Sequence, residues 1–224
     1  MSNDRPLIFV DLDDTLFQTA RKTPAGIEKH VATLDITGNA NGYMTNVQKS
    51  FAHWLLAHSD VVPVTARSVE AYSRVKLPFT AGAICSHGGV MLDVMGRLDH
   101  DWNEQMKQTL ASYQSRLHEL SATTLAIGQE LGFSLRGWVV EEAQLFHYVV
   151  TKHNESDDSI LGNFRQCLHS RLSVAQVLLS FLSINLPTLC LVARPCAQVQ
   201  TLLSTQGPGG VSTQLETCAS QCAS

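Results

Sequence analysis

The sequence predicts an α/β fold, with a mainly parallel core sheet followed by an inserted α+β part. Two observations carry this prediction. In residues 6–92, short apolar runs alternate with segments of helical period, as expected where helices connect parallel strands. From about residue 95 the alternation stops, and one long helical pattern precedes two strand-like runs. A chain of 224 residues is long enough for a substantial core.

The first part contains its elements in a simple order. We expect a strand at 6–10, a helix at 46–58, a strand at 61–64, a helix at 68–75, a strand at 82–85, a turn at 86–89 and a short apolar run at 90–92. The strand segments are continuous apolar runs, typical of buried parallel strands, although Pro63 cannot donate a ladder hydrogen bond. Ser68 suits the N-cap of the second helix, and Glu70 suits its first turn.

The second part has a different pattern. One helix face is indicated by side chains four and three residues apart: Met106, Leu110, Tyr113, Leu117, Leu120 and Thr124. Strands are predicted at 133–140 and 145–151, joined as a hairpin, and a further helix at 157–170. We therefore predict a core in residues 1–94 and an α+β cap inserted at 95–165.

Composition excludes several classes of function. The formal net charge of −4 and the pI of about 6.1 argue against a nonspecific binder of nucleic acids or membrane surfaces. No apolar run approaches the roughly 18–20 residues of a membrane span, and the polar start does not resemble a signal peptide. Only Cys85 precedes residue 167, and no Cys-x-x-Cys or zinc-like spacing occurs. We expect a cytoplasmic protein.

The last part of the chain is abnormally poor in charge. Residues 172–224 contain two charged side chains, Arg194 and Glu216, whereas the chain as a whole has 36. One interpretation is a buried apolar segment followed by a polar tail. The other, which we favour, is that residues 166–224 are an aberrant segment from a shifted reading frame or an abnormal terminus. On that interpretation residues 172–224 should pack poorly, with no clear strand to complete the core.

The most informative motif directly follows the first strand. Asp11-Leu12-Asp13-Asp14-Thr15 places alternating carboxylates where ligands bind in open α/β sheets, at the carboxyl end of a strand. Phosphoryl transfer through an aspartyl phosphate needs this arrangement, because one carboxylate attacks phosphorus and the second transfers protons. Crowded carboxylates favour a bound Mg²⁺. The alternative is a solvated turn in which Asp13 or Asp14 caps a helix.

A second strand ends in a comparable way. Thr65 follows the apolar run at 61–64 and lies just before a helix. A hydroxyl and free backbone amides at such a junction bind phosphate oxygens. Taken alone, Thr65 is an ordinary strand-end threonine, but two such strand ends in this order favour a phosphate site.

These motifs resemble those of the haloacid dehalogenase superfamily of phosphohydrolases. Residues 11–17 match its first motif, and residues 62–68 match its second in the form common in sugar-phosphate phosphatases of the Cof and sucrose-phosphate phosphatase type. Ser86-His87-Gly88-Gly89 is similar to a turn that often follows the next strand in that family. The segment at about 95–170 occupies the place of the family's α/β cap.

The resemblance implies roles for individual residues. Asp11 would be the nucleophile and a Mg²⁺ ligand, and Asp13 the general acid/base, with its backbone carbonyl as a second metal ligand. Thr65 would hold the transferring phosphoryl group with help from the amide of Ala66. Arg67 would contact the phosphorylated substrate or form a structural salt bridge. His87 is expected to be a turn residue, whereas Arg136 or His147 of the cap could reach substrate.

The resemblance also implies features that this chain lacks. The family uses a Lys or Arg after the cap and a late Gly-Asp-x-x-x-Asp motif, but this chain has no Lys after Lys152 and no Asp after Asp158. We therefore expect a Mg²⁺-dependent phosphatase architecture for a small phosphorylated metabolite, such as a sugar phosphate, with impaired catalysis in this chain. The alternatives are a noncatalytic phosphosugar-binding pseudoenzyme and a phosphotransferase of the same superfamily.

Overall fold

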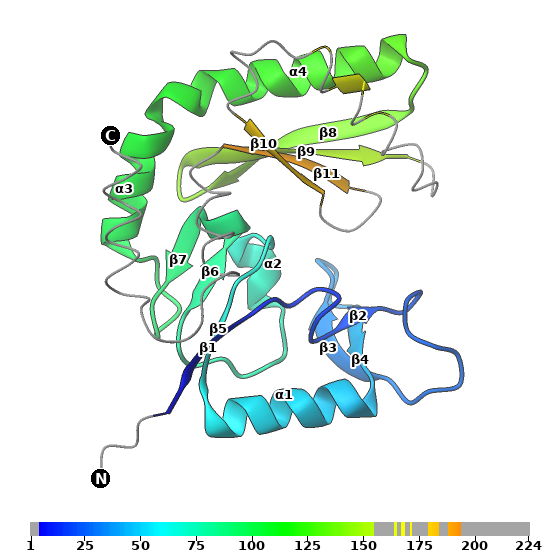
Figure 1. Cartoon of the computed structure of the whole chain (residues 1–224), viewed down its shortest axis with the longest axis vertical. Helices are drawn as coiled ribbons and strands as arrows, with labels where there is room; N and C mark the ends of the chain where they lie inside the picture. Colours follow the sequence, from blue (N-terminus) through cyan, green and yellow to red (C-terminus); the bar gives the residue numbers. More distant parts are fainter. Residues whose placement is uncertain are drawn as a thin grey trace. The chain divides into compact units, whose positions relative to one another are not determined.

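The computed structural model describes residues 5–154, 164, 167, 168, 171, 179–183 and 188–193. The chain divides into two compact units, and the boundary between them falls after Asn103 (Figure 1). Unit 1 is taken below as the described residues up to Asn103, and unit 2 as those from Glu104 onward. Among the described residues, no helix combines the length and apolar character needed to cross a membrane.

Unit 1 is built around parallel strands, as predicted. β1 (Leu7–Val10) pairs in parallel with β5 (Asp60–Pro63), with Val10 opposite Pro63. A parallel bridge between Val64 and Ile84 connects β5 to β6 (Ala83–Cys85), which turns back into β7 (Val90–Leu92) as an antiparallel neighbour. The carboxyl ends of β1 and β5 therefore lie side by side.

Two helices of unit 1 form where local signals predict them. α1 (Asn46–His58) begins at a capping box, in which the Thr45 side chain accepts from the Gln48 amide and the Gln48 side chain accepts from the Thr45 amide. α2 (Val69–Ser73) has Ser68 as its N-cap, with the Ser68 hydroxyl accepting from the Ala71 amide at 3.1 Å.

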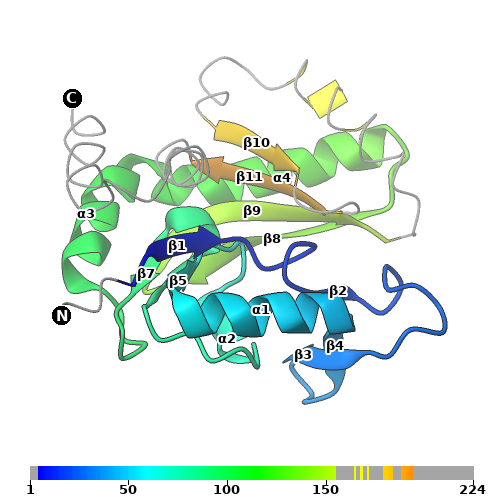
Figure 2. The ribbon, with the colours of Figure 1, turned by 60° about the horizontal axis from the view of Figure 1, so that its bottom comes forward.

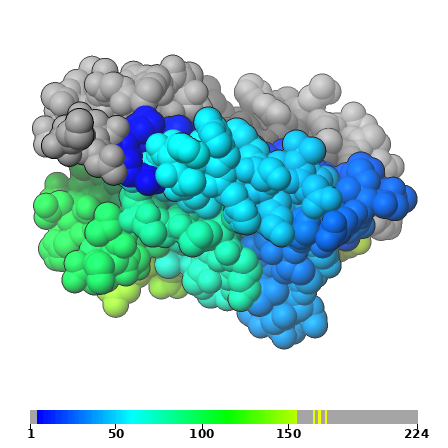
Figure 3. Space-filling view, turned by 90° about the horizontal axis from the view of Figure 1, so that it is seen from below, coloured from blue at the N-terminus to red at the C-terminus, as the bar shows by residue number. Residues whose placement is uncertain are grey.

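α1 forms over the predicted range 46–58, but the apolar side chains spaced along it are not all on its packing face. Ala52 and Leu55 are its buried residues. Val47, Phe51 and Trp54 instead remain 79%, 49% and 57% exposed. Figure 3 shows α1 in cyan, spread across one face of unit 1.

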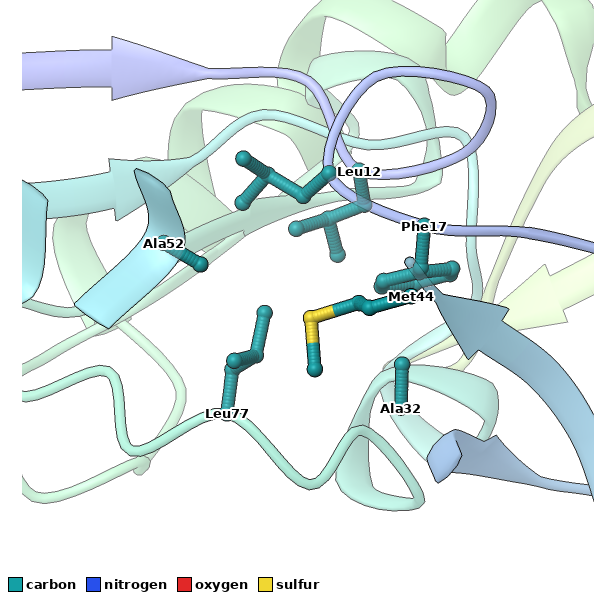
Figure 4. Close-up of a cluster of buried hydrophobic side chains, with 7 residues drawn as sticks. Leu12, Phe17, Ala32, Met44, Ala52 and Leu77 are labelled. Carbon is teal, nitrogen blue, oxygen red and sulfur yellow. The ribbon is translucent and has the colours of Figure 1, made fainter. Parts of the chain in front are cut away.

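The chain between β1 and α1 forms a small antiparallel sheet that is not predicted from the sequence. It comprises β2 (Gln18–Thr19), β3 (His30–Leu34) and β4 (Ala40–Met44), in the order β2-β4-β3 (Figure 2). Its buried side chains join a cluster around the turn after β1, in which the side chains point toward one another (Figure 4): Leu12, Leu16, Phe17, Ala32, Met44, Ala52 and Leu77. This cluster fixes the turn that carries Asp11 and Asp13.

Unit 2 packs one long helix on an antiparallel sheet. α3 (His100–Leu110) continues through a 3₁₀ turn (Ala111–Tyr113) into α4 (Gln114–Glu130), which lies along one face of β8 (Leu135–Glu142) and β9 (Leu145–His153) (Figure 1). The predicted helix face is buried except at Tyr113. Ala143 and Gln144 have φ of 50° and 65°, as in a tight two-residue hairpin turn.

Two described segments of the late part of the chain belong to the sheet of unit 2. Two strands do form there, namely β10 (Leu179–Ser183) and β11 (Thr188–Ala193), and they extend the sheet of unit 2 in the order β10-β11-β9-β8. Neither strand contains a charged residue, and β11 pairs with the second edge of β9. They do not extend the parallel strands of unit 1. The other residues of the predicted aberrant segment lie outside the described part, apart from the isolated positions 167, 168 and 171.

Candidate active site

A tight turn after β1 positions the predicted carboxylates. The Leu12 carbonyl accepts from the amides of Leu16 at 3.0 Å and Phe17 at 3.2 Å, and the Asp14 amide donates to the Phe17 carbonyl at 2.7 Å. Asp14 has φ of 64°, in the left-handed region that Asp tolerates better than most residues. Leu12, Leu16 and Phe17 are buried in a hydrophobic cluster and hold this turn against it. The aspartates are therefore placed by hydrophobic burial of Leu12 between them and of Leu16 and Phe17 after them.

Asp11 is held by the same turn. Its Oδ2 accepts a hydrogen bond from Thr15 Oγ1 at 2.8 Å. Partial desolvation of the carboxylate raises the pKa of Asp11, although the residue as a whole is exposed, and the negative charges of Asp13 and Asp14 add to this increase. The hydrogen bonds from Thr15 and the Leu12 backbone act in the opposite direction but do not cancel the increase in pKa. A nearby cation would therefore favour the ionised form that a nucleophile needs.

Asp13 forms a two-point ion pair with Arg67. Arg67 Nε donates to Asp13 Oδ2 and Arg67 Nη2 donates to Asp13 Oδ1, both at 2.8 Å. The side chains of Arg67 and Asp13 are only 16% and 34% exposed. Both carboxylate oxygens of Asp13 are therefore engaged in the structure.

Thr65 and Asp11 lie just beyond the ends of the neighbouring strands β5 and β1. Val10 pairs with Pro63 at the ends of β1 and β5, and the Val64 amide donates to the Val10 carbonyl at 2.8 Å. Asp11 therefore follows the end of β1 by one residue, and Thr65 follows the end of β5 by two. This confirms that they share one edge of adjacent parallel strands. Thr65 is almost fully buried, and its Oγ1 accepts from the Arg67 amide at 3.1 Å. Ala66 connects these two residues.

The turn after β6 closes against the same strand end. The Ser86 amide donates to the Arg67 carbonyl at 2.8 Å, and the His87 amide donates to the Thr65 carbonyl at 3.2 Å. Ser86 and His87 both have left-handed φ, of 52° and 58°, and both are fully buried. Such conformations persist only where surrounding contacts hold them. His87 is thus part of a turn, as expected from the sequence.

Lys22 is a residue near the site that sequence reasoning missed. Its Nζ forms an ion pair with Asp14 Oδ2 at 2.6 Å. The pair partly offsets the third carboxylate of the Asp11–Asp14 group. No pattern in the sequence indicates this contact, because it depends on how the loop after β2 folds back.

The two cap residues named from the sequence lie in different environments within unit 2. Arg136 is exposed and its Nη1 donates to Asn154 Oδ1 at 2.7 Å. His147 is fully buried, and its Nε2 lies 3.1 Å from the Glu142 carbonyl. Burial lowers the pKa of His147, which favours the neutral ring. His147 therefore has the environment of a core histidine.

The described residues offer few donors for a metal ion. Within them, no group of three or more His, Cys, Asp or Glu side chains could hold one. The Asp11 carboxylate and the main-chain oxygen of Asp13 are hard oxygen donors of the kind Mg²⁺ prefers. The side chain of Asp13 is already engaged by Arg67. The site thus fits Mg²⁺ through Asp11 and the Asp13 backbone, with a shell that these two residues alone do not complete.

Comparison with known proteins gives a match in fold. No protein-family model matches the chain, and no curated protein matches it in sequence. The C-terminal domain of trehalose-6-phosphate phosphatase from C. albicans is similar over 85% of this chain, with a TM-score of 0.54 and 12% identity. A mutant IMP-nucleotidase from Plasmodium falciparum with bound IMP is similar over 92%, with a TM-score of 0.50 and 12% identity.

The chain spans 57% of the length of each of these two structures. A haloacid dehalogenase-like hydrolase from B. subtilis also matches, over 94% of this chain and 79% of its own, at 15% identity and a TM-score of 0.42. The parallel strands of unit 1 and the similarity to phosphatase structures confirm the predicted fold class. The chain therefore has the α/β fold of the trehalose-6-phosphate phosphatase domain and the IMP-nucleotidase.

Proposed function

We propose that the protein is a Mg²⁺-dependent phosphatase that hydrolyses a small phosphomonoester, and that its substrate is a sugar phosphate. The observation that carries this proposal is the placement of Asp11 and Thr65 at the ends of adjacent parallel strands, with Asp13 two residues further on. One phosphate at this edge would be within reach of a carboxylate and a hydroxyl. The names of the structural neighbours, a phosphatase and a nucleotidase, support the phosphomonoester class.

In the proposed reaction, an Asp11 oxygen attacks phosphorus and the bond from phosphorus to the leaving oxygen breaks. Asp13 gives a proton to that oxygen, which leaves as an alcohol. Water then attacks the phosphorus of the aspartyl phosphate and gives a proton to Asp13. This step releases inorganic phosphate and restores the Asp11 carboxylate.

The remaining groups would bind the phosphate and its counterion. Thr65 and the Ala66 amide are proposed to contact the phosphoryl oxygens. Mg²⁺, held by the Asp11 carboxylate and the Asp13 main-chain oxygen, would offset negative charge between Asp11 and the phosphate. The chain has no Lys after Lys152 and no Asp after Asp158, so we propose that its turnover is slow.

The same absence favours a second candidate function. A protein with Asp11, Thr65 and bound Mg²⁺ but without a complete charge-stabilising set would bind a phosphosugar without hydrolysing it. Transfer of the phosphoryl group to an acceptor other than water is the further alternative within the same chemistry.

A phosphate-release panel tests these proposals. The parent chain, Asp11→Asn and the exposed-carboxylate control Asp101→Asn are compared with and without Mg²⁺ on glucose 6-phosphate, trehalose 6-phosphate and IMP. We expect slow Mg²⁺-dependent release by the parent and Asp101→Asn, and release at the protein-free rate by Asp11→Asn. Equal release by Asp11→Asn and the parent would remove Asp11 as the nucleophile. Mg²⁺-dependent binding without release by any variant would favour the binding function.

A further inference from the structure

We propose that Arg67 is a positioning residue that holds the Asp13 carboxylate, and that it does not bind the phosphate of the substrate. The role of Asp13 as acid/base rests on the proposed function above. The assignment of Arg67 to Asp13 rests on geometry alone. It decides between the two roles that the sequence leaves open for Arg67.

All three nitrogens of the Arg67 guanidinium are already directed at protein acceptors. Nε and Nη2 donate to the two oxygens of Asp13 at 2.8 Å. Nη1 lies 3.4 Å from both Thr33 Oγ1 and the Ala71 carbonyl. A phosphate could form a two-point contact with Nε and Nη2 only if it displaced Asp13, since Asp13 already occupies this planar fork of the guanidinium.

The residues packed around the Arg67 guanidinium restrict its movement. Its central carbon lies 5.2 Å from the centroid of the buried Phe17 ring, which belongs to the same turn as Asp13. Thr33 of β3 and Ala71 of α2 approach Nη1. Arg67 therefore connects the catalytic turn to β3 and α2, and its own burial favours retention of the ion pair.

The main chain of Arg67 is fixed separately from its side chain. Its amide donates to Thr65 Oγ1 at 3.1 Å, and its carbonyl accepts from the Ser86 amide at 2.8 Å. The residue is thus anchored at the proposed phosphate-binding strand end while its side chain reaches Asp13. This arrangement sets the position of Asp13 relative to Thr65, which is what a proton-transfer group requires.

A double-mutant cycle tests the ion pair without depending on turnover. The variants are Arg67→Met, Asp13→Asn and their combination. Arg74→Met is the control, because Arg74 pairs with Glu70 and donates to the Leu34 carbonyl rather than to Asp13. We expect Arg67 and Asp13 to be coupled by about fivefold or more in the unfolding equilibrium constant. Additive effects of the two substitutions would overturn the proposal.

Binding of inorganic phosphate in the presence of Mg²⁺, measured by calorimetry, tests the second half of the proposal. We expect Arg67→Lys and Arg67→Met to change the dissociation constant by less than about threefold. A residue that donates to the phosphate would cost roughly tenfold or more when removed. A tenfold loss that persists in the Asp13→Asn background would assign Arg67 to the phosphate and overturn the proposal.

Single-turnover kinetics test whether Arg67 acts through Asp13. p-Nitrophenyl phosphate needs little protonation of its leaving group, whereas glycerol 1-phosphate needs it fully. We expect Arg67→Met to slow the first step on glycerol 1-phosphate by about 10-fold to 100-fold and to leave the rate of p-nitrophenol release unchanged. In the Asp13→Asn background, Arg67→Met should cause no further slowing. Equal slowing on both substrates would overturn the positioning role. If the parent hydrolyses neither substrate, the proposed function fails, while the cycle and the phosphate titration still decide the partner of Arg67.

Discussion

The hydroxyl of Thr15 donates to the Asp11 carboxylate at 2.8 Å, across a single tight turn. This contact lowers the pKa of Asp11, whereas burial and the neighbouring aspartates raise it. Thr15 thus favours the ionised form of the proposed nucleophile. The balance of these opposing effects can be measured directly.

We predict that Thr15→Val raises the pKa of Asp11 further, because the carboxylate loses a hydrogen bond that stabilises its charge. The carboxyl ¹³C shift of Asp11, followed by NMR as a function of pH, is the measurement. Thr37→Val is the matched control. Thr37 Oγ1 donates to Asp35 Oδ1 at 2.7 Å and is the main cause of the lowered pKa of Asp35. This control should raise the pKa of Asp35 and leave Asp11 unchanged, and an Asp11 shift unmoved by Thr15→Val would contradict the argument.

The raised pKa of Asp11 also predicts how stability depends on pH. Burial raises the pKa of Asp11 in the folded state, so ionisation of Asp11 disfavours folding. This loss of stability begins as the pH rises above the ordinary pKa of 3.8 and is complete once the pH has passed the folded-state pKa. Asp11→Asn removes the charge. We therefore expect it to raise Tm at pH 7, with a gain that disappears as the pH falls toward 3.8.

Asp93→Asn provides a control of opposite sign for this prediction. Hydrogen bonds from the Arg97 backbone and side chain lower the pKa of Asp93, so its ionised form stabilises the folded state above 3.8. Asp93→Asn should lower Tm at pH 7 and have less effect as the pH falls through the folded-state pKa. Thermal melts of the three proteins across this pH range distinguish the signs, and a lower Tm for Asp11→Asn at pH 7 would refute the expectation for Asp11.

Thr65 supports the strand end through its hydroxyl. Thr65→Val removes the hydroxyl oxygen that accepts from the Arg67 amide at an almost fully buried position. This loss should lower the free energy of unfolding by about 1–3 kcal/mol. For a chain of this size, each kcal/mol corresponds to a Tm decrease of about 2–4 °C. Thr65→Ser keeps the hydroxyl and should lose less stability. Chemical denaturation measures the difference, and equal losses would show that the hydroxyl is not what matters.

The local elements of unit 1 could be predicted because their signals are local. β1 and β5 are continuous apolar runs, and α2 begins at a Ser N-cap. The pairing of β1 with β5 follows from the alternation of strands and helices. The edge shared by Asp11 and Thr65 can therefore be predicted from the sequence alone.

Other features depend on contacts that no local pattern carries. β4 begins Ala-Asn-Gly, and such residues have little intrinsic preference for strands. This strand forms because it pairs with β2 and β3 and covers Phe17. The ion pair of Arg67 with Asp13 joins residues 54 positions apart, so spacing along the chain does not reveal it.

The β4 strand provides a last prediction, centred on Gly42. A Cβ added at Gly42 would overlap Thr33 Cγ2 and lie 3.3 Å from Phe17 Cδ2. Gly42→Ala should therefore cost roughly 1–3 kcal/mol in the free energy of unfolding, because neither neighbour can withdraw easily from the packed cluster. Thr33→Ser removes the methyl group that the new Cβ meets. We expect the double variant Gly42→Ala/Thr33→Ser to recover part of the loss, as measured by denaturant unfolding. If the double variant shows only the sum of the two single effects, then contact with Thr33 is not the reason that a glycine is needed at this position.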